Sequence, residues 1–301
     1  MKKIHIFLIV CIGSVFWASP LYACTSFAVF GNHFLYGMNF DYFLVPLKFI
    51  IDTYGSIKTF HLAFNVKLPG MDFFAKTGGM NSKGLFGACQ ILMPPVEVPS
   101  QAGVNDIFIP IFYESFAPLD KVQTVENLLK DKRLINFPGA SHHNLYADTS
   151  GNGMIIEPGT DKNRITKIEN NFIVMTNFPV YDLKGKNYTE AKGMGADRYK
   201  IAYEYLRDNV DNFSIDKGFE LLQKAINKDP GLATRCSMIF DPIHNEIFIA
   251  IDRNFNKIWK ASLEESTIET FSGFNISIKK PLDSKGLMAL EISIKTLNDT
   301  V

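Results

Sequence analysis

The grouping of strand-like and helix-like segments along this chain constrains its fold more than any other feature of the sequence. Short runs of strand-forming residues, many of them bounded by Gly, Asn, Asp or Pro, come in groups with helical patterns between them. Strands grouped apart from helices favour a layered α+β domain over a βαβ alternation. The predicted strands are Cys24–Phe30, His33–Tyr36, Ser56–Phe64, Leu85–Leu92, Asn144–Ala147, Met154–Glu157, Asn171–Thr176, Ser237–Phe240, Glu246–Ile251 and Lys257–Ala261. We therefore expect a single α+β domain over residues 24–301.

Helices are predicted in two pairs, which separate the groups of strands. Each begins at a residue whose side chain can accept a hydrogen bond from the first turn, and each carries apolar residues at helical spacing. The helix that begins the first pair is expected to end near Ala117. The four expected first residues are Asn105, Asp120, Asp197 and Asp216. Residues 262–301 carry no pattern from which a structure is predicted.

The N-terminal segment, residues 1–23, has the layout of a secretory signal peptide. Lys2 and Lys3 precede an apolar run from Ile4 to Trp17, and the segment ends on the small residue Ala23. The apolar run is shorter than the ~20 residues that a membrane-spanning helix needs. We therefore expect cleavage before Cys24, export to the periplasm or the medium, and no stable membrane insertion of the mature chain.

Composition narrows the kinds of partner that the protein can have. The formal net charge is zero, so nothing indicates the basic surface that nucleic acid requires. The sequence has no CxxC motif and no Cys/His cluster, so no zinc site is predicted. Cys89 and Cys236 could form a disulfide in an oxidising compartment or remain as free buried thiols.

Cleavage before Cys24 would place two reactive groups on one residue. A thiol is a good nucleophile as the thiolate, and a free α-amine has a reference pKa of ~7.7–8.0, so it can accept a proton near neutral pH. An N-terminal cysteine can therefore serve as nucleophile and base together. Leu21–Cys24 also has the pattern of a lipoprotein processing site, in which Cys24 would carry a lipid anchor instead.

The segment from Cys24 to Tyr42 (CTSFAVFGNHFLYGMNFDY) resembles the start of the choloylglycine hydrolase family, which includes bile salt hydrolases and penicillin V acylases. Members begin with a Cys-Thr strand and a hairpin, followed by a Gly-Arg-Asn-x-Asp-aromatic motif, for which this chain has Gly37–Tyr42. The resemblance implies that Asp41 bonds to the amine and thiol region of Cys24 and holds the nucleophile in place.

Further matches follow along the chain to about Ala261. Val174–Pro179 resembles the Thr-Asn-x-Pro element of the family, which implies that the Asn177 amide donates to the oxyanion of the tetrahedral intermediate. Gly195–Tyr199 resembles the start of a helix that places an arginine, here Arg198, in the active site. Arg235 is a weaker candidate for the same role. Asp148 and Glu157 lie in a matching strand–turn–strand and are expected to be structural.

Two positions depart from the family pattern. Met38 stands where members usually carry an arginine beside the nucleophile, and it supplies no charge to stabilise a thiolate. Gln90 or Ile91 stands where bile salt hydrolases have an asparagine that contacts the oxyanion. Gln90 is accordingly a candidate substrate contact, together with Phe43 and Leu92 on segments that could line an acyl pocket.

The resemblance implies a four-layer αββα sandwich of the N-terminal nucleophile hydrolase type. It also implies hydrolysis of a linear, non-peptide amide bond in a small N-acyl substrate, without metal or cofactor. The catalytic residues would be Cys24, Asp41, Asn177 and Arg198. An acyltransferase of the same fold and a catalytically weak exported binding protein or lipoprotein are the alternatives, and the sequence leaves a homo-oligomer open.

Overall fold

The structure is a computed structural model of the 301-residue chain. It describes residues 24–68, 70–98, 105–108, 117–135, 141–229 and 231–297. The predicted signal peptide therefore lies outside the described residues, as do residues 109–116.

One antiparallel sheet carries the N-terminal strand in its interior. Its eight strands, in spatial order, are β12 (Phe172–Met175), β1 (Thr25–Phe30), β2 (Phe34–Asp41), β13 (Thr234–Asp241), β14 (Glu246–Ile251), β15 (Ile258–Ser262), β16 (Thr267–Ser272) and β17 (Lys279–Pro281). Strands β1 and β2 form the predicted hairpin, with Phe30 opposite Phe34 across the turn. Because β12 pairs with β1 on its other side, the residues that follow β12 are brought close to Cys24.

A second antiparallel sheet packs face to face with the first. Its eight strands, in spatial order, are β11 (Arg164–Lys167), β10 (Gly153–Glu157), β9 (Ser141–Ala147), β6 (Phe86–Leu92), β5 (Met71–Asn81), β4 (Ile57–Leu68), β3 (Leu47–Tyr54) and β18 (Leu287–Met288). Aromatic rings join the sheets: Tyr36 stacks on Phe86 with ring centroids 5.3 Å apart, and Phe240 contacts Phe60 and Phe86. Burial of these side chains between the sheets forms the main apolar core.

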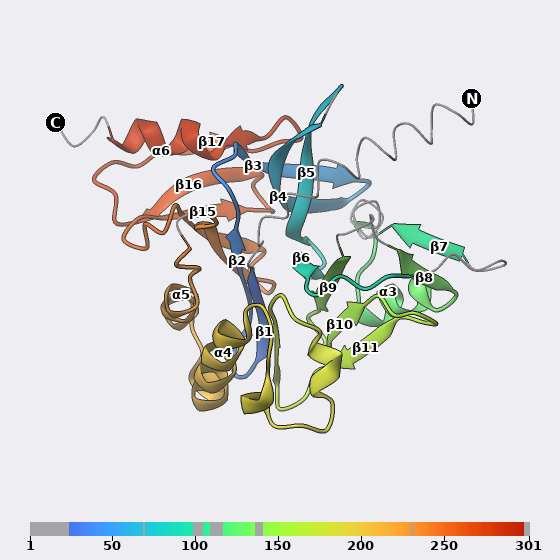
Figure 1. Ribbon diagram of the computed structural model, residues 1–301. Helices are drawn as coiled ribbons and strands as arrows, with labels where there is room; N and C mark the ends of the chain where they lie inside the picture. Colours follow the sequence, from blue (N-terminus) through green and yellow to red (C-terminus); the bar gives the residue numbers. More distant parts are fainter. Residues whose placement is uncertain are drawn as a thin grey trace.

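Helices cover the outer faces of the two sheets, so the layers follow the predicted αββα order (Figure 1). The first sheet is covered by α4 (Ala196–Asn209) and α5 (Ile215–Lys224), which the short 3₁₀ helix η3 (Val210–Asn212) joins. The second sheet is covered by α3 (Val122–Leu129), whose Val125 packs in a smaller core with Tyr146. None of the helices among the described residues is long and apolar enough to cross a bilayer.

The helix predicted from Asn105 is wrong where the structure describes it. Residues Asn105–Phe108 form strand β7, which pairs in parallel with β8 (Lys132–Ile135) as a separate small sheet beside α3. Pro110 lies in the second turn of the predicted helix and has no N–H to donate, so it disfavours a helix begun at Asn105. The rest of that predicted helix lies in residues 109–116, outside the described part.

The other helices begin within two residues of the predicted positions, but different groups cap them. Carboxylate Asp148 Oδ2 accepts a hydrogen bond from Val122 N at 2.7 Å, so a distant side chain caps α3 in place of Asp120. Helix α5 is capped by Ser214, which precedes Asp216. Residues beyond 262, for which nothing was predicted, form β16, β17, β18 and α6 (Ala289–Leu297), and α6 contacts β3.

Candidate active site

Cys24 lies directly before β1, between the ends of β2 and β12, and is buried. Its backbone N–H donates to Asn177 Oδ1 at 2.8 Å. Its thiol Sγ donates to the backbone oxygen of Asp41 at 3.9 Å. The residue is therefore held by its neighbours at both of the atoms on which the predicted chemistry depends.

Arg198 connects the surrounding groups from the first turn of α4. Its Nη1 donates to the Cys24 carbonyl oxygen at 2.6 Å and to Thr25 Oγ1 at 2.9 Å, and its Nη2 donates to Asn177 Oδ1 at 2.9 Å. Gly195 makes this geometry possible, since its φ is +76° and an added Cβ would lie 2.6 Å from Arg198 Nη2. A planar guanidinium is the side chain suited to several fixed hydrogen bonds of this kind.

Asp41 lies at the end of β2 with its carboxyl group on the helix-covered side. Oδ1 accepts from Thr234 Oγ1 at 2.6 Å, and Oδ2 lies 3.5 Å from Arg198 Nη1. Burial raises the pKa of Asp41 to about 7, against the lowering effects of Arg198 and Thr234. The expectation that Asp41 bonds to the Cys24 amine concerns the processed protein and stays a prediction. In the unprocessed chain, the backbone N–H of Cys24 donates to Asn177 Oδ1.

Asn177 follows β12 and joins the two sheets at the site. The side-chain Nδ2 of Asn177 donates to the backbone carbonyl oxygen of Ile91 at 2.9 Å. The backbone carbonyl oxygen of Asn177 accepts from the Met93 N–H at 2.6 Å. A carboxamide has two donor hydrogens, and Ile91 O accepts one of those on Asn177. Asn177 is fully buried, which fixes the direction of its amide group.

The thiol of Cys24 is held in its protonated form near neutral pH. Burial, and next the nearby carboxyl of Asp41, raise its pKa to about 12, although Arg198 acts in the opposite direction. A thiol of this kind needs a base to take its proton during attack. Cys89 and Cys236 are also free and buried, so no disulfide joins them.

The residues at which this chain departs from the family pattern lie on the inter-sheet side. Met38 is fully buried opposite Ser26, and an added Cβ at Gly78 of the other sheet would lie 2.6 Å from its sulfur. Gln90 is buried, and its Nε2 donates to Ser26 Oγ at 2.6 Å. The site therefore has a thioether at Met38, where the family pattern has an arginine, and a buried carboxamide at Gln90, one of the two positions matched to the bile salt hydrolase asparagine.

The two predicted acyl-pocket residues lie in different environments. Leu92 is fully buried at the end of β6, one residue before the Met93 N–H that bonds to Asn177. Phe43 is half-buried and packs edge-on against Tyr42, whose ring contacts Phe64 at 4.7 Å. Arg235 does not join the site, since it pairs with Asp252 at 3.1 Å.

Three site groups were missed from the sequence: the hydroxyls of Thr25 and Thr234, and the backbone carbonyl of Ile91. Thr25 belongs to the Cys-Thr pair, and the alternation of β1 would have turned its side chain to the helix side with that of Asp41. Thr234 carries no local signal, because the pairing of β13 with β2 brings it to Asp41. Backbone groups such as the Ile91 carbonyl have no sequence signature.

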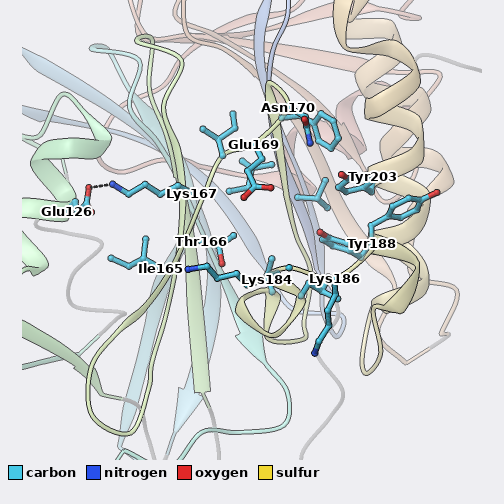
Figure 2. Close-up of a pocket in the computed structure, with 18 residues that line it drawn as sticks. Glu126, Ile165, Thr166, Lys167, Glu169, Asn170, Lys184, Lys186, Tyr188 and Tyr203 are labelled. Carbon is cyan, nitrogen blue, oxygen red and sulfur yellow. Dashed lines mark hydrogen bonds and ion pairs between the residues drawn. The ribbon is translucent and has the colours of Figure 1, made fainter.

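A cavity of about 540 Å³ lies elsewhere, at the edges of both sheets (Figure 2). It is lined by β11, β12, α4 and the 3₁₀ helices η1 (Val180–Leu183) and η2 (Tyr188–Glu190), and it contains none of the predicted catalytic residues. Tyr188 and Tyr203 stack with ring centroids 4.4 Å apart on one side, and the Lys167–Glu126 ion pair lies on the other. The described residues hold no group of three metal-ligating side chains.

Solved structures with this arrangement of sheets and helices include two kinds of amide hydrolase. A mutant of conjugated bile acid hydrolase from Clostridium perfringens is 17% identical with a TM-score of 0.62, and the match covers 83% of this chain and 96% of that chain. Penicillin V acylase from Agrobacterium tumefaciens is 15% identical with a TM-score of 0.60, covering 88% and 100%. At this identity the likeness shows the fold.

The sequence comparisons identify the family. A search of curated proteins returns no relative that matches this chain. The model of the linear amide C–N hydrolases, choloylglycine hydrolase family, matches residues 56–214, which is more than half of the chain. The chain therefore belongs to the choloylglycine hydrolase family of linear amide C–N hydrolases.

Proposed function

We propose that the mature protein begins at Cys24 and hydrolyses a linear amide bond of a small N-acyl substrate, with Cys24 as nucleophile and its α-amine as base. One observation carries the proposal. The nitrogen and the sulfur of Cys24 lie in a single buried cluster with Asp41, Asn177 and Arg198, in a chain of an amide hydrolase family.

Each step of the proposed reaction uses a group of this cluster. The α-amine takes the thiol proton while Sγ attacks the acyl carbonyl carbon, and the carbonyl electron pair moves to its oxygen. The second Nδ2 hydrogen of Asn177 would stabilise that oxyanion, as one such donor typically contributes ~2.7–4 kcal/mol. The C–N bond then breaks, and the ammonium of Cys24 gives its proton to the departing amine, which leaves a thioester.

Water completes the cycle by the same proton transfers. The α-amine takes a proton from water as the water oxygen attacks the thioester carbonyl. The C–S bond breaks, the carboxylic acid leaves, and the proton returns to the sulfur. Arg198 would hold the Cys24 carbonyl and the Asn177 amide in place throughout, because it bonds to both.

The acyl part of the substrate is proposed to be apolar. Phe40 lies on β2, next to Asn39, which pairs with Thr25. Its ring stacks on Tyr42 with ring centroids 5.4 Å apart. Phe64 extends this aromatic group, and Phe43 and the exposed Leu44 follow in the adjoining loop. The structural neighbours are named for conjugated bile acid and for penicillin V.

The test is hydrolysis of penicillin V and of glycine-conjugated bile acids by the secreted protein, with release of the free amine measured. Cys24→Ala is expected to abolish activity, whereas Cys89→Ala and Cys236→Ala, which remove the two other buried thiols, retain it. Undiminished activity in Cys24→Ala would rule out the proposed nucleophile. The intact mass of the secreted protein shows whether it begins at an unmodified Cys24. A lipid adduct on Cys24 would support the alternative that Cys24 is a lipoprotein anchor.

A further inference from the structure

A line of buried polar side chains runs from the loop after Asn177 to the strand that carries Cys24. Glu157, His143, Gln90 and Ser26 are all at most 2% exposed. They lie on β10, β9, β6 and β1, and strand alternation turns all four towards the space between the sheets. The mechanism proposed above uses none of them, although Ser26 is two residues from the nucleophile.

One end of this line holds the loop that follows Asn177. The carboxylate of Glu157 accepts hydrogen bonds from Val180 N at 2.9 Å and Tyr181 N at 3.0 Å. Its Oε1 also lies 3.0 Å from His143 Nδ1. Because a carboxylate with two backbone donors is an acceptor, the Nδ1–H of His143 donates to it, which leaves His143 Nε2 for another partner.

At the centre of the line, two polar atoms have no hydrogen-bond partner in the described part of the chain. His143 and Gln90 are directly opposite each other in the pairing of β9 and β6. Neither His143 Nε2 nor Gln90 Oε1 has a hydrogen-bond partner among the residues that the structure describes, and both atoms are buried. Opposite side chains on one face lie ~4.5–5.5 Å apart at Cβ, and buried polar atoms are almost always satisfied by protein or by water.

We propose that one buried water donates to both His143 Nε2 and Gln90 Oε1 and so joins the two side chains, and that His143 acts as a positioning residue for the amide hydrolysis proposed above. The link closes a ring of contacts. Asn177 bonds to Cys24 N, Ser26 bonds to Gln90, Gln90 to His143, His143 to Glu157, and Glu157 to the backbone of Val180.

The ring fixes the distance between Cys24, the nucleophile, and Asn177, the oxyanion donor. Ser26 fixes β1 two residues after Cys24, while Glu157 fixes the chain three residues after Asn177. A shift of one side relative to the other would move the Asn177 amide away from the carbonyl that Cys24 attacks. Misplacement by about 1 Å can cost about 100-fold in rate, so the expected effect falls on kcat.

Nitrogen NMR of the full secreted protein tests the link without a substrate. Gln90→Leu, which keeps the chain length and removes the carboxamide, is expected to shift the His143 Nε2 resonance and leave that of His244 unchanged. His244 is the matched reference, because it pairs with Asp241 at 2.7 Å on the surface. An unmoved His143 Nε2 resonance in Gln90→Leu would show that the two residues are not joined.

Kinetics with phenoxyacetyl-p-nitroanilide, an activated linear amide, test the positioning role. His143→Asn places its Nδ2 where Nδ1 was and keeps the Glu157 contact, but loses Nε2. We expect His143→Asn and Gln90→Leu each to lower kcat by about 10- to 100-fold with KM little changed, and the double variant to lower it no further. His244→Asn is expected to match the wild type, and thermal unfolding establishes that each variant is folded.

The outcomes separate this inference from the function on which it rests. If Cys24→Ala is inactive while folded His143→Asn and Gln90→Leu keep the wild-type kcat, the positioning role is wrong and the proposed function stands. If Cys24→Ala is as active as the wild type, the proposed function fails, and the NMR result still decides the link. Should His143→Asn not fold, Gln90→Leu carries both measurements.

Discussion

Arg198 and Cys24 are joined by a 2.6 Å hydrogen bond from Nη1 to the carbonyl oxygen of Cys24, although the two residues are 174 positions apart in the sequence. The same guanidinium bonds to the Asn177 side chain and lies 3.5 Å from the Asp41 carboxylate. Arg198 thus fixes the position of Cys24 relative to Asn177 and Asp41. Because Arg198 belongs to α4, the geometry of the site depends on how α4 packs.

Substitution of Arg198 by lysine is expected to lower kcat by about 10- to 100-fold, because an ammonium group cannot reproduce the fork of donors that positions Asn177. Steady-state kinetics with a linear amide substrate measure the effect. Arg235→Lys is the matched control, since Arg235 pairs with the exposed Asp252 and lies outside the cluster. Equal losses in the two variants, or no loss in Arg198→Lys, would contradict the role.

Gly195→Ala is expected to reduce both stability and kcat. The φ of +76° disfavours alanine by roughly 1–2 kcal/mol, and the new Cβ would lie 2.6 Å from Arg198 Nη2 and displace it. Gly185→Ala isolates the second effect, because Gly185 has a φ of +74° with no atom within 4 Å of an added Cβ. We expect similar unfolding midpoints for both variants and a lower kcat in Gly195→Ala alone. Wild-type kcat in Gly195→Ala would show that the contact with Arg198 is unimportant.

Asp41 should make the protein less stable as pH rises. Its pKa of about 7 lies above the ordinary value of 3.8, so the folded state favours the protonated carboxyl. The stability from this preference is complete below about pH 4 and is lost as pH rises through about 7. Urea unfolding should be measured for wild type and Asp41→Asn between pH 4 and 8. The free energy of unfolding of the variant, relative to that of the wild type, should increase with pH and become constant above about pH 7.

The processed protein provides an internal comparison for this pH dependence. Cleavage before Cys24 would place an ammonium group near the Asp41 carboxyl and favour its ionised form. The difference in free energy of unfolding between wild type and Asp41→Asn should therefore change less with pH in the processed protein than in the unprocessed chain. The prediction would be contradicted if the difference in free energy of unfolding did not depend on pH in either form. It would also be contradicted if the wild type gained stability relative to the variant as pH rises.

Restoring the family arginine at Met38 is expected to harm the protein. Met38 is fully buried and packs on Gly78 between the sheets, where an unpaired guanidinium costs about 3 kcal/mol or more. Met38→Leu, which conserves volume, should cost less than about 1.5 kcal/mol. Thermal unfolding and kcat distinguish the two. A Met38→Arg variant as stable as the wild type and faster in turnover would show that the position still accepts a charge.

Local patterns in the sequence predicted the elements that carry the site. The hairpin around Gly31–Asn32, the strand before Asn177 and the helix that begins beside Arg198 lie where they were expected. The family fold is confirmed by the two packed sheets between helical layers. These elements are decided by turn residues and by apolar periodicity, both of which are local.

The contacts within the site could not be predicted in the same way. Asp41 meets Thr234 and Arg198 because β2 pairs with β13 and α4 packs across the sheet, which are relationships between distant segments. The strands β3 and β5 were missed, and in β5 the polar and glycine residues of Lys76–Gly79 hide the alternation. The line from Ser26 to Glu157 depends on four strands and has no local signal.

The central claim is that an N-terminal Cys24 forms the covalent intermediate, and intact-protein mass spectrometry of a turnover reaction quenched in acid tests it most directly. The account predicts a chain of residues 24–301 that gains the mass of one acyl group, with the adduct mapped to Cys24 by peptide analysis and absent from Cys24→Ala. A chain that begins elsewhere, a lipid on Cys24, or an acyl group on Cys89 or Cys236 would contradict it.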